Sequence, residues 1–175
     1  MVLLIGGSSH TGKTALAHRL MKKYGIPYLS IDHLKMGLIR SGMTALTPED
    51  DSELTPFLWN ILKEMIKTAI ENKQELIIEG CYIPYDWKNS FSEEYLKEIE
   101  CRFLIMSEEY ISSHFEDIRK YADIIEKRLD DSWLTPEALI EDNLSNLAGC
   151  QAYEIPHIMI DKEYDTDIEI TVRGE

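Results

Sequence analysis

The sequence predicts an α/β fold in which helices cover both faces of a five-stranded parallel sheet. Two observations lead to this prediction. Short apolar segments alternate with longer segments whose apolar residues recur at helical spacing, an order typical of parallel sheets. A loop that contains glycine, GSSHTGKT over residues 7–14, directly follows the first apolar segment. The length of 175 residues predicts a single domain, 1–175.

The first part of the chain predicts two strands and two helices. Residues 2–6 (VLLIG) are apolar up to their final glycine, as in a strand buried on both faces. From Gly12 onward, apolar residues recur at helical spacing. This predicted helix is expected to end at Gly25 and Pro27. Residues 28–32 (YLSID) predict a second strand, followed by a short helix over 33–42 (HLKMGLIRSG). Residues 42–53 are the most loop-like part of the chain.

The second part predicts three more strands and the helices between them. A long helix is expected to begin with Thr55 as its N-cap and Pro56 at its first position. One further helix is expected to begin at Ser107, and another is capped by TPEA at 135–138. Residues 167–172 alternate with period two and predict an edge strand or hairpin. The remaining strands are predicted at 75–80, 101–106 and 157–160.

The composition bears on partners and on location. The chain has 32 acidic and 18 basic residues and a formal charge of −14, which repels polyanions, so we expect no nucleic-acid partner. No apolar run approaches the length of a membrane span, and the first residues lack the basic flank of a signal peptide. We therefore expect a cytoplasmic protein without a membrane partner. The widely spaced cysteines predict neither a disulfide framework nor a zinc site: Cys81, Cys101 and Cys150.

The loop GSSHTGKT matches the phosphate-binding pattern G-x-x-x-x-G-K-[ST] without a mismatch. Its glycines let successive N–H groups point at phosphate oxygens, Lys13 reaches the β- and γ-phosphates, and Thr14 is placed to ligate Mg²⁺. A turn that matched by chance need not follow a buried strand and open an amphipathic helix, as this one does. We expect His10 to be a solvent-facing spacer. The residues predicted to bind ATP are Gly7, Ser8, Ser9, His10, Thr11, Gly12, Lys13 and Thr14.

Two carboxylates follow the second and third predicted strands. Ligands bind beyond the carboxyl ends of strands in an open parallel sheet, so Asp32 and Glu79 are candidate site residues. A carboxylate facing the phosphate loop can hold Mg²⁺ through water or take the proton of an acceptor hydroxyl. We predict that Asp32 is catalytic and contacts the acceptor, and that Glu79 contacts both metal and acceptor. The alternative for Asp32 is an N-cap of the following helix.

Three arginines are candidates for contacts with the substrates. Arg40 lies eight residues beyond Asp32 and is a candidate clamp for a carboxylate or phosphate of the acceptor. Arg119 and Arg128 lie in the predicted helical insertion after the fourth strand, where an arginine can close over the γ-phosphate. A solvated surface role is the alternative for each of them.

The phosphate loop, the segment SIDHL, the arginine at 40 and the segment LIIEGCYIP together resemble small-molecule kinases of the adenylate-kinase-like P-loop group. Among these the chain looks most like 2-phosphoglycerate kinase-type proteins, over the stretch from the first strand to about residue 85. The resemblance implies a three-layer α/β/α P-loop NTPase fold, with ATP as donor and Mg²⁺ as cofactor. It also implies an acceptor between the helix of Arg40 and the segment after Glu79, and a helical lid over approximately residues 107–150.

The segment after the third strand departs from the nucleoside monophosphate kinases. These kinases have a pattern resembling Asp-Gly-Phe-Pro-Arg there, whereas EGCYIPYDW contains no arginine, which disfavours that class of acceptor. Tyr82, Tyr85 and Trp87 predict a partly aromatic acceptor pocket with Tyr82 in contact with the substrate, and core packing is the alternative. The predicted function is transfer of the ATP γ-phosphoryl group to a hydroxyl or phosphate of a small molecule. The alternative is a nucleotide-binding regulatory protein or NTPase without an acceptor.

Overall fold

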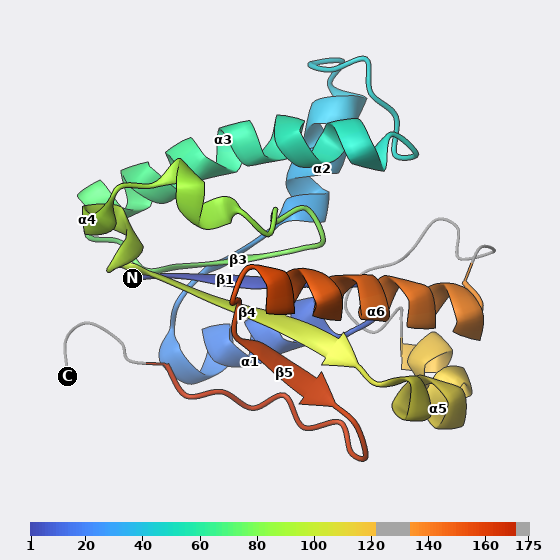
Figure 1. Ribbon diagram of the computed structural model, residues 1–175. Helices are drawn as coiled ribbons and strands as arrows, with labels where there is room; N and C mark the ends of the chain where they lie inside the picture. Colours follow the sequence, from blue (N-terminus) through green and yellow to red (C-terminus); the bar gives the residue numbers. More distant parts are fainter. Residues whose placement is uncertain (122–133, 171–175) are drawn as a thin grey trace.

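The computed structural model describes residues 1–121 and 134–170, which form a parallel sheet between layers of helices (Figure 1). The five strands are ordered β2-β3-β1-β4-β5, and every pair of neighbours is parallel. The predicted α/β fold is confirmed. The strands are β1 (Val2–Gly7), β2 (Tyr28–Ser30), β3 (Leu76–Glu79), β4 (Ile99–Met106) and β5 (His157–Ile160).

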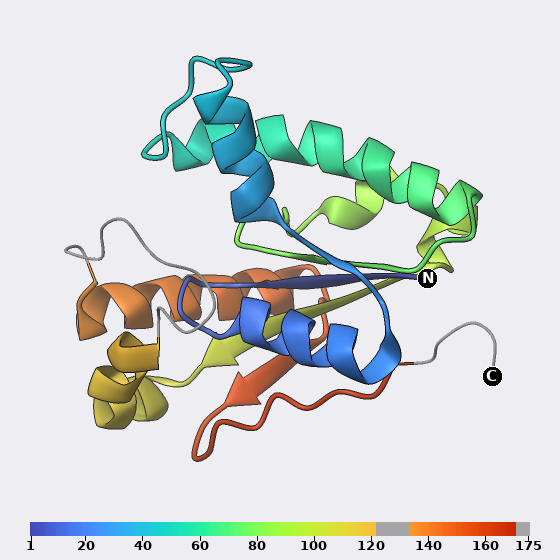
Figure 2. The same cartoon turned by 180° about the vertical axis from the view of Figure 1, so that it is seen from behind.

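Helices lie on both faces of this sheet. Figure 2 shows α1 on the face opposite α3, with α2 standing beside α3. The α-helices are α1 (Lys13–Tyr24), α2 (Ile31–Arg40), α3 (Asp51–Glu71), α4 (Glu93–Leu96), α5 (Glu108–Tyr121) and α6 (Pro136–Ala152), and a short 3₁₀ helix spans Trp87–Ser90. Thr135 caps α6 as predicted, because its side chain accepts a hydrogen bond from the N–H of Ala138 (3.2 Å).

The central strand β1 explains why its sequence is continuously apolar. Val2 and Leu4 belong to the core beneath α3, whereas Leu3 and Ile5 belong to the core beneath α1. All four side chains are fully buried. A strand with helices on both faces has no solvent side, so both sets of alternating residues must be apolar.

The register of the sheet brings distant residues to one edge. Glu79, the last residue of β3, pairs with Ile5 of β1 on one side and with Ser30 of β2 on the other. The loop after β1 and the helix after β2 therefore begin on either side of Glu79. Because parallel strands all end at the same edge, this register assembles the candidate site.

The start of α3 differs from the prediction. The helix begins at Asp51, and Pro56 lies inside it; Thr55 is not its N-cap. The hydroxyl of Thr55 instead donates to the carbonyl of Asp51 (3.1 Å). The preceding turn is closed by Asp50, whose carboxylate accepts hydrogen bonds from the N–H and hydroxyl of Thr47. Pro56 removes only one main-chain hydrogen bond, near the solvent-exposed start of the helix, so the helix continues through it.

The segment after β5 also differs from the prediction. Residues 167–170 form no strand, and 171–172 lie outside the described residues. The period-two pattern is nevertheless real, because Thr166 and Ile170 are buried while Asp167 and Glu169 are exposed. The segment is extended and held by its side chains rather than by a hydrogen-bonded ladder.

Candidate functional site

The phosphate loop needs its two glycines. Gly7 has φ 126° and Gly12 has φ 82°, conformations that residues with a Cβ rarely adopt. A Cβ on Gly7 would also lie 2.4 Å from the carbonyl oxygen of Leu104 in β4. His10, half-buried with φ 64°, takes a left-handed conformation as well. The loop is therefore a fixed backbone turn and not an extended connection.

Polar contacts inside the loop converge on one carbonyl group. The carbonyl of Ser8 accepts hydrogen bonds from Lys13 Nζ (2.6 Å) and from the hydroxyl of Thr11 (2.9 Å). Lys13 is 7% exposed, so its charge is held within the loop. Lys13 is also the first residue of α1, which places the positive end of the helix dipole at the same point. A loop lysine and a helix N-terminus together form an anion-binding arrangement.

Thr14 and Glu79 lie side by side at the carboxyl edge of the sheet. The hydroxyl of Thr14 donates to Glu79 Oε1 (3.2 Å), and Glu79 is only 2% exposed. Hydroxyl and carboxylate oxygens are the ligands that Mg²⁺ prefers, and the ion commonly uses one or two protein ligands together with phosphates. The pair that the sequence predicts for metal binding therefore fits such an ion in type and proximity.

A polar network begins at Asp32 on the other side of Glu79. Ser30 is the N-cap of α2, so Asp32 lies inside the first turn and the N-cap alternative for it is wrong. Its carboxylate pairs with Lys35 Nζ (2.8 Å). Lys35 also donates to the hydroxyl of Tyr82 (2.9 Å), which in turn donates to Asp51 Oδ1 (2.6 Å). The network joins α2, α3 and the segment after β3.

Tyr82 is the buried centre of this network. Only 6% of the residue is exposed, and burial together with the hydrogen bond to Asp51 raises the pKa of the phenol far above its ordinary value. The hydroxyl therefore keeps its proton and remains a donor to Asp51. Lys35 lies over the same ring, 4.9 Å from its centre. Tyr82, the aromatic residue that the sequence predicts to contact the substrate, thus lies where several hydrogen bonds meet.

The other two aromatic residues of this segment are packing residues. Trp87 is 3% exposed and belongs to the core beneath α3. Tyr85 packs against Phe103 and against Gly149 of α6, where a Cβ would lie 2.4 Å from its ring. Core packing describes the contacts of Trp87 and of the Tyr85 ring, whereas the hydroxyl of Tyr85 donates to Asn146 Oδ1 of α6 (3.3 Å).

Two of the three predicted arginines, Arg40 and Arg119, belong to the described residues, and both are exposed. Arg40 is exposed at the last turn of α2, about 12 Å along the axis from Asp32 at 1.5 Å per residue. Arg119 is exposed in the last turn of α5. Arg128 lies outside the described residues. The roles predicted for all three stay predictions.

Four residues in contact with the site were missed from the sequence. Lys35 and Asp51 belong to the network of Asp32, and the spacing of three residues between Asp32 and Lys35 on one helix was a usable signal. Asn146 of α6 donates to the hydroxyl of Ser8 (2.9 Å), and Tyr164 donates to the carbonyl of Thr11 (3.1 Å). No local pattern marks these last two residues.

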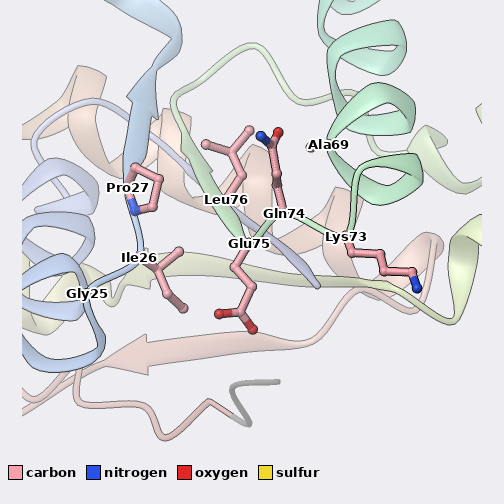
Figure 3. A pocket seen from close by; sticks show the side chains of 8 residues that line it. All are labelled: Gly25, Ile26, Pro27, Ala69, Lys73, Gln74, Glu75 and Leu76. Carbon is pink, nitrogen blue, oxygen red and sulfur yellow. The ribbon is translucent and has the colours of Figure 1, made fainter. Parts of the chain in front are cut away.

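A cavity of about 470 Å³ lies elsewhere on the molecule (Figure 3). It opens at the start of β2 and β3, the sheet edge opposite the phosphate loop. Its residues come from the turn after α1, the end of α3 and the start of β3: Gly25, Ile26, Pro27, Ala69, Lys73, Gln74, Glu75 and Leu76. This cavity is separate from the candidate site. Among the described helices, none has the length and apolar character that a membrane span requires.

Comparison with solved structures agrees with the fold. A gluconokinase from Sinorhizobium meliloti 1021 superposes with a TM-score of 0.51 and 16% identity, over 91% of this chain and 81% of that chain. A shikimate kinase from Bacteroides thetaiotaomicron superposes with a TM-score of 0.52 and 14% identity, over 92% and 86%. A putative kinase from Chloroflexus aurantiacus gives 0.51 and 16%, over 93% and 88%. At these identities the likeness shows a shared fold.

Comparison of the sequence itself identifies the family. No curated protein matches the chain. The sequence model of the zeta toxin family matches residues 1–133, which contain the phosphate loop, Asp32 and Glu79. The comparisons support the wider resemblance to P-loop small-molecule kinases but not the expected closeness to 2-phosphoglycerate kinase-type proteins. Because the match spans well over half of its length, the chain belongs to the zeta toxin family.

Proposed function

We propose that this chain is a Mg²⁺-dependent phosphotransferase that moves the γ-phosphoryl group of ATP to a hydroxyl or phosphate group of a small molecule. The proposal treats residues 1–175 as one domain, with a lid formed by approximately residues 107–150. It rests most heavily on one observation: Glu79, which contacts Thr14 of the phosphate loop, pairs in the sheet with Ser30, two residues before Asp32.

The donor side follows from the loop. Lys13 and the N–H groups of residues 7–14 would hold the phosphates, with Lys13 exchanging its bond to the Ser8 carbonyl for a phosphate oxygen. Thr14 and Glu79 would hold Mg²⁺, which when bound neutralises charge on the phosphates. Phosphoryl transfer requires mainly positioning and charge neutralisation, and these residues supply both.

The acceptor side favours a kinase over a simple NTPase. The side chain of Asp32 is 43% exposed, so its carboxylate is accessible although it is fixed by Lys35. A fixed, accessible carboxylate next to the phosphate site can take the proton of an incoming hydroxyl group. We assign this role to Asp32, and assign Tyr82 and Arg40 to contacts with the acceptor. Arg119 and Arg128 are assigned to the lid, where they would approach the γ-phosphate.

The polar groups at this side favour a hydroxyl acceptor over a phosphate acceptor. The ammonium group of Lys35 is already engaged by Asp32 and Tyr82. Two carboxylates, Asp32 and Asp51, remain on this network. A dianionic phosphate would meet net negative charge there, whereas hydroxyl groups can donate to carboxylates.

An acceptor screen tests the proposed reaction. ADP release from Mg·ATP is measured alone and with panels of sugars and polyols, hydroxy acids and nucleoside monophosphates. We expect release to rise with at least one hydroxyl compound and not with nucleoside monophosphates. Release that never depends on an added compound would support the alternative, an NTPase without an acceptor.

Two variants with matched controls assign the roles within the site. Lys13→Ala should abolish ATP turnover, whereas Lys23→Ala, a change at the other end of the same helix, should not. Asp32→Asn should lower turnover far more than ATP affinity, and Glu49→Gln in the exposed loop before α3 should change neither. Unchanged turnover in Lys13→Ala would contradict the donor site. Equal losses of turnover and affinity in Asp32→Asn would indicate a structural role for Asp32.

Cys81 offers a binding assay that needs no acceptor. It is the exposed one of the three cysteines, and its sulfur lies 3.9 Å from the hydroxyl of Ser9 in the phosphate loop. Cys101 and Cys150 are buried, and burial raises the pKa of both thiols, to about 11 for Cys150. A thiol reagent should therefore label Cys81 selectively. We expect Mg·ATP to slow this labelling, and an unchanged rate would contradict nucleotide binding at the loop.

A further inference from the structure

The segment over residues 161–170 runs from the end of β5 back along α1 (Figure 2). Ile168 and Ile170 pack against the core beneath α1. Thr166, only 2% exposed, accepts a hydrogen bond from Arg19 of α1 (2.6 Å), and Arg19 also lies 3.5 Å from the carboxylate of Asp167. The segment is thus fastened to the helix that begins at the phosphate loop.

Tyr164 extends from this fastened segment to the phosphate loop. Its hydroxyl donates to the carbonyl of Thr11 (3.1 Å). The hydroxyl also fills the space beside Gly12, because a Cβ on Gly12 would lie 1.7 Å from it. The residue nevertheless remains 41% exposed. Because a tyrosine this exposed buries little of its surface in the core, core packing alone does not account for its contact with the loop.

The hydrogen bond constrains the peptide group between Thr11 and Gly12. A peptide group is planar and trans, so its C=O and N–H point in opposite directions. With the Thr11 carbonyl held toward Tyr164, the Gly12 N–H must point the other way, away from Tyr164. Gly12 lacks a Cβ and can rotate readily, so a hydrogen bond from outside the loop restrains this peptide.

We infer that Tyr164 is a positioning residue that holds the Thr11–Gly12 peptide in the orientation that presents the Gly12 N–H to a bound phosphate. The inference rests on the proposed function, because it requires that the loop bind phosphates. Tyr164 acts through the backbone of the loop and does not itself contact the reacting atoms. This role of Tyr164 makes residues 161–170 part of the donor site. These residues lie outside 1–133, the part of the chain that matches the family model.

The test compares Tyr164→Phe with the wild-type protein for two ligands, Mg·ATP and Mg·tripolyphosphate, by isothermal titration calorimetry. The variant keeps the ring and loses only the hydroxyl. One hydrogen bond corresponds to about a two- to tenfold change in affinity. We expect both ligands to bind about two- to tenfold more weakly, because tripolyphosphate has no base or ribose and reports on the phosphate cradle alone. The matched control is Tyr153→Phe, at a tyrosine of similar exposure that stacks on Tyr85.

The outcomes separate this inference from the proposed function. Equal binding by Tyr164→Phe and wild type would overturn the inference and leave the donor site in place. Weaker binding of ATP with unchanged binding of tripolyphosphate would also overturn it, because the hydroxyl would then act on the base or ribose. A wild-type protein that binds neither ligand would overturn both proposals.

A second variant gives an independent reading, including the case in which Tyr164→Phe does not fold. Arg19→Gln removes the fastening at Thr166 and Asp167 without changing the tyrosine. It should weaken the binding of both ligands in the same direction, and by no more than Tyr164→Phe does. Hydrogen exchange should also become faster over residues 161–170. Unchanged affinity with faster exchange would contradict the inference.

Discussion

Replacing Tyr82 by phenylalanine tests the buried junction on the acceptor side. The hydroxyl of Tyr82 donates to Asp51 at 2.6 Å and accepts from Lys35 at 2.9 Å. The variant removes both bonds but keeps the ring and its contact with the Lys35 cation. Lys35 also retains its partner Asp32 (2.8 Å). The loss therefore falls on the hydrogen bonds that join α3 and α2 to the segment after β3.

The expected magnitude follows from the two partners of the hydroxyl. A hydrogen bond to a charged group contributes about 1.5–3 kcal/mol to stability. Asp51 is exposed and regains water when the bond is lost, so we expect a value just below this range, about 1–1.5 kcal/mol. For a domain of this size that corresponds to a decrease in Tm of about 2–6 °C.

The assay is a double-mutant cycle with Tyr82→Phe, Asp51→Ala and the double variant. The free energy of unfolding is measured by urea denaturation, followed by tryptophan fluorescence. The cycle cancels the separate effect of Asp51 as an acidic residue in the first turn of α3. Most of the loss should appear as a coupling energy of about 1 kcal/mol between the two positions.

A coupling energy below about 0.3 kcal/mol, the error of such cycles, would refute this reasoning. The contact would then contribute nothing to stability, and Tyr82 would be a packing residue like Trp87. If the coupling is as expected, the same variant should also lower turnover with the acceptor found in the screen, because α2 and Asp32 lose one of their attachments to the segment after β3.

Three further changes give distinct readouts. Glu79→Gln should remove most of the dependence of ATP affinity on Mg²⁺, because a carboxylate ligand beside Thr14 becomes a neutral amide; Mg²⁺ titrations of nucleotide binding measure this. Asp142→Asn should stabilise the fold near neutral pH, because partial desolvation of the carboxyl and then the neighbouring acids Glu141 and Asp51 raise the pKa of Asp142. A raised carboxyl pKa means that stability is lost as pH rises through the unfolded and folded pKa values, so the gain should vanish below about pH 4; urea denaturation at several pH values measures this. Thr135→Ala should cost about 1 kcal/mol, because the cap of α6 is lost; thermal unfolding measures this.

Each of these three predictions has an outcome that contradicts it. Glu79→Gln with the Mg²⁺ dependence of the wild type would place the metal ligand elsewhere. A gain from Asp142→Asn that persists at pH 3 would point to a cause other than charge. Thr135→Ser keeps a capping hydroxyl and should recover most of the loss in Thr135→Ala, so an equal loss in both would assign the cost to packing.

The sequence accounted for the parts of the site that depend on contiguous residues. The phosphate loop could be predicted because its glycines, Lys13 and Thr14 fix the turn and the helix start within eight positions. The placement of Asp32 just after one strand and of Glu79 at the end of another could be predicted, because parallel strands end at the same edge of a sheet; their roles stay predictions. Local signals were less reliable for boundaries. The pair Thr55–Pro56 looked like a helix start, whereas the turn closed by Asp50 begins the helix earlier.

The sequence by itself thus determined the order of strands and helices, the phosphate loop, and which strand ends carry acids. Only the tertiary structure decided which of these groups touch. The 3.2 Å contact of Thr14 with Glu79 depends on the register between β1 and β3, and the junction at Tyr82 depends on how α2 and α3 meet. Tyr164 reaches the loop from 153 positions away. Contacts between residues so distant in sequence cannot be predicted from periodic or local sequence patterns, because they form only when whole helices and strands pack together.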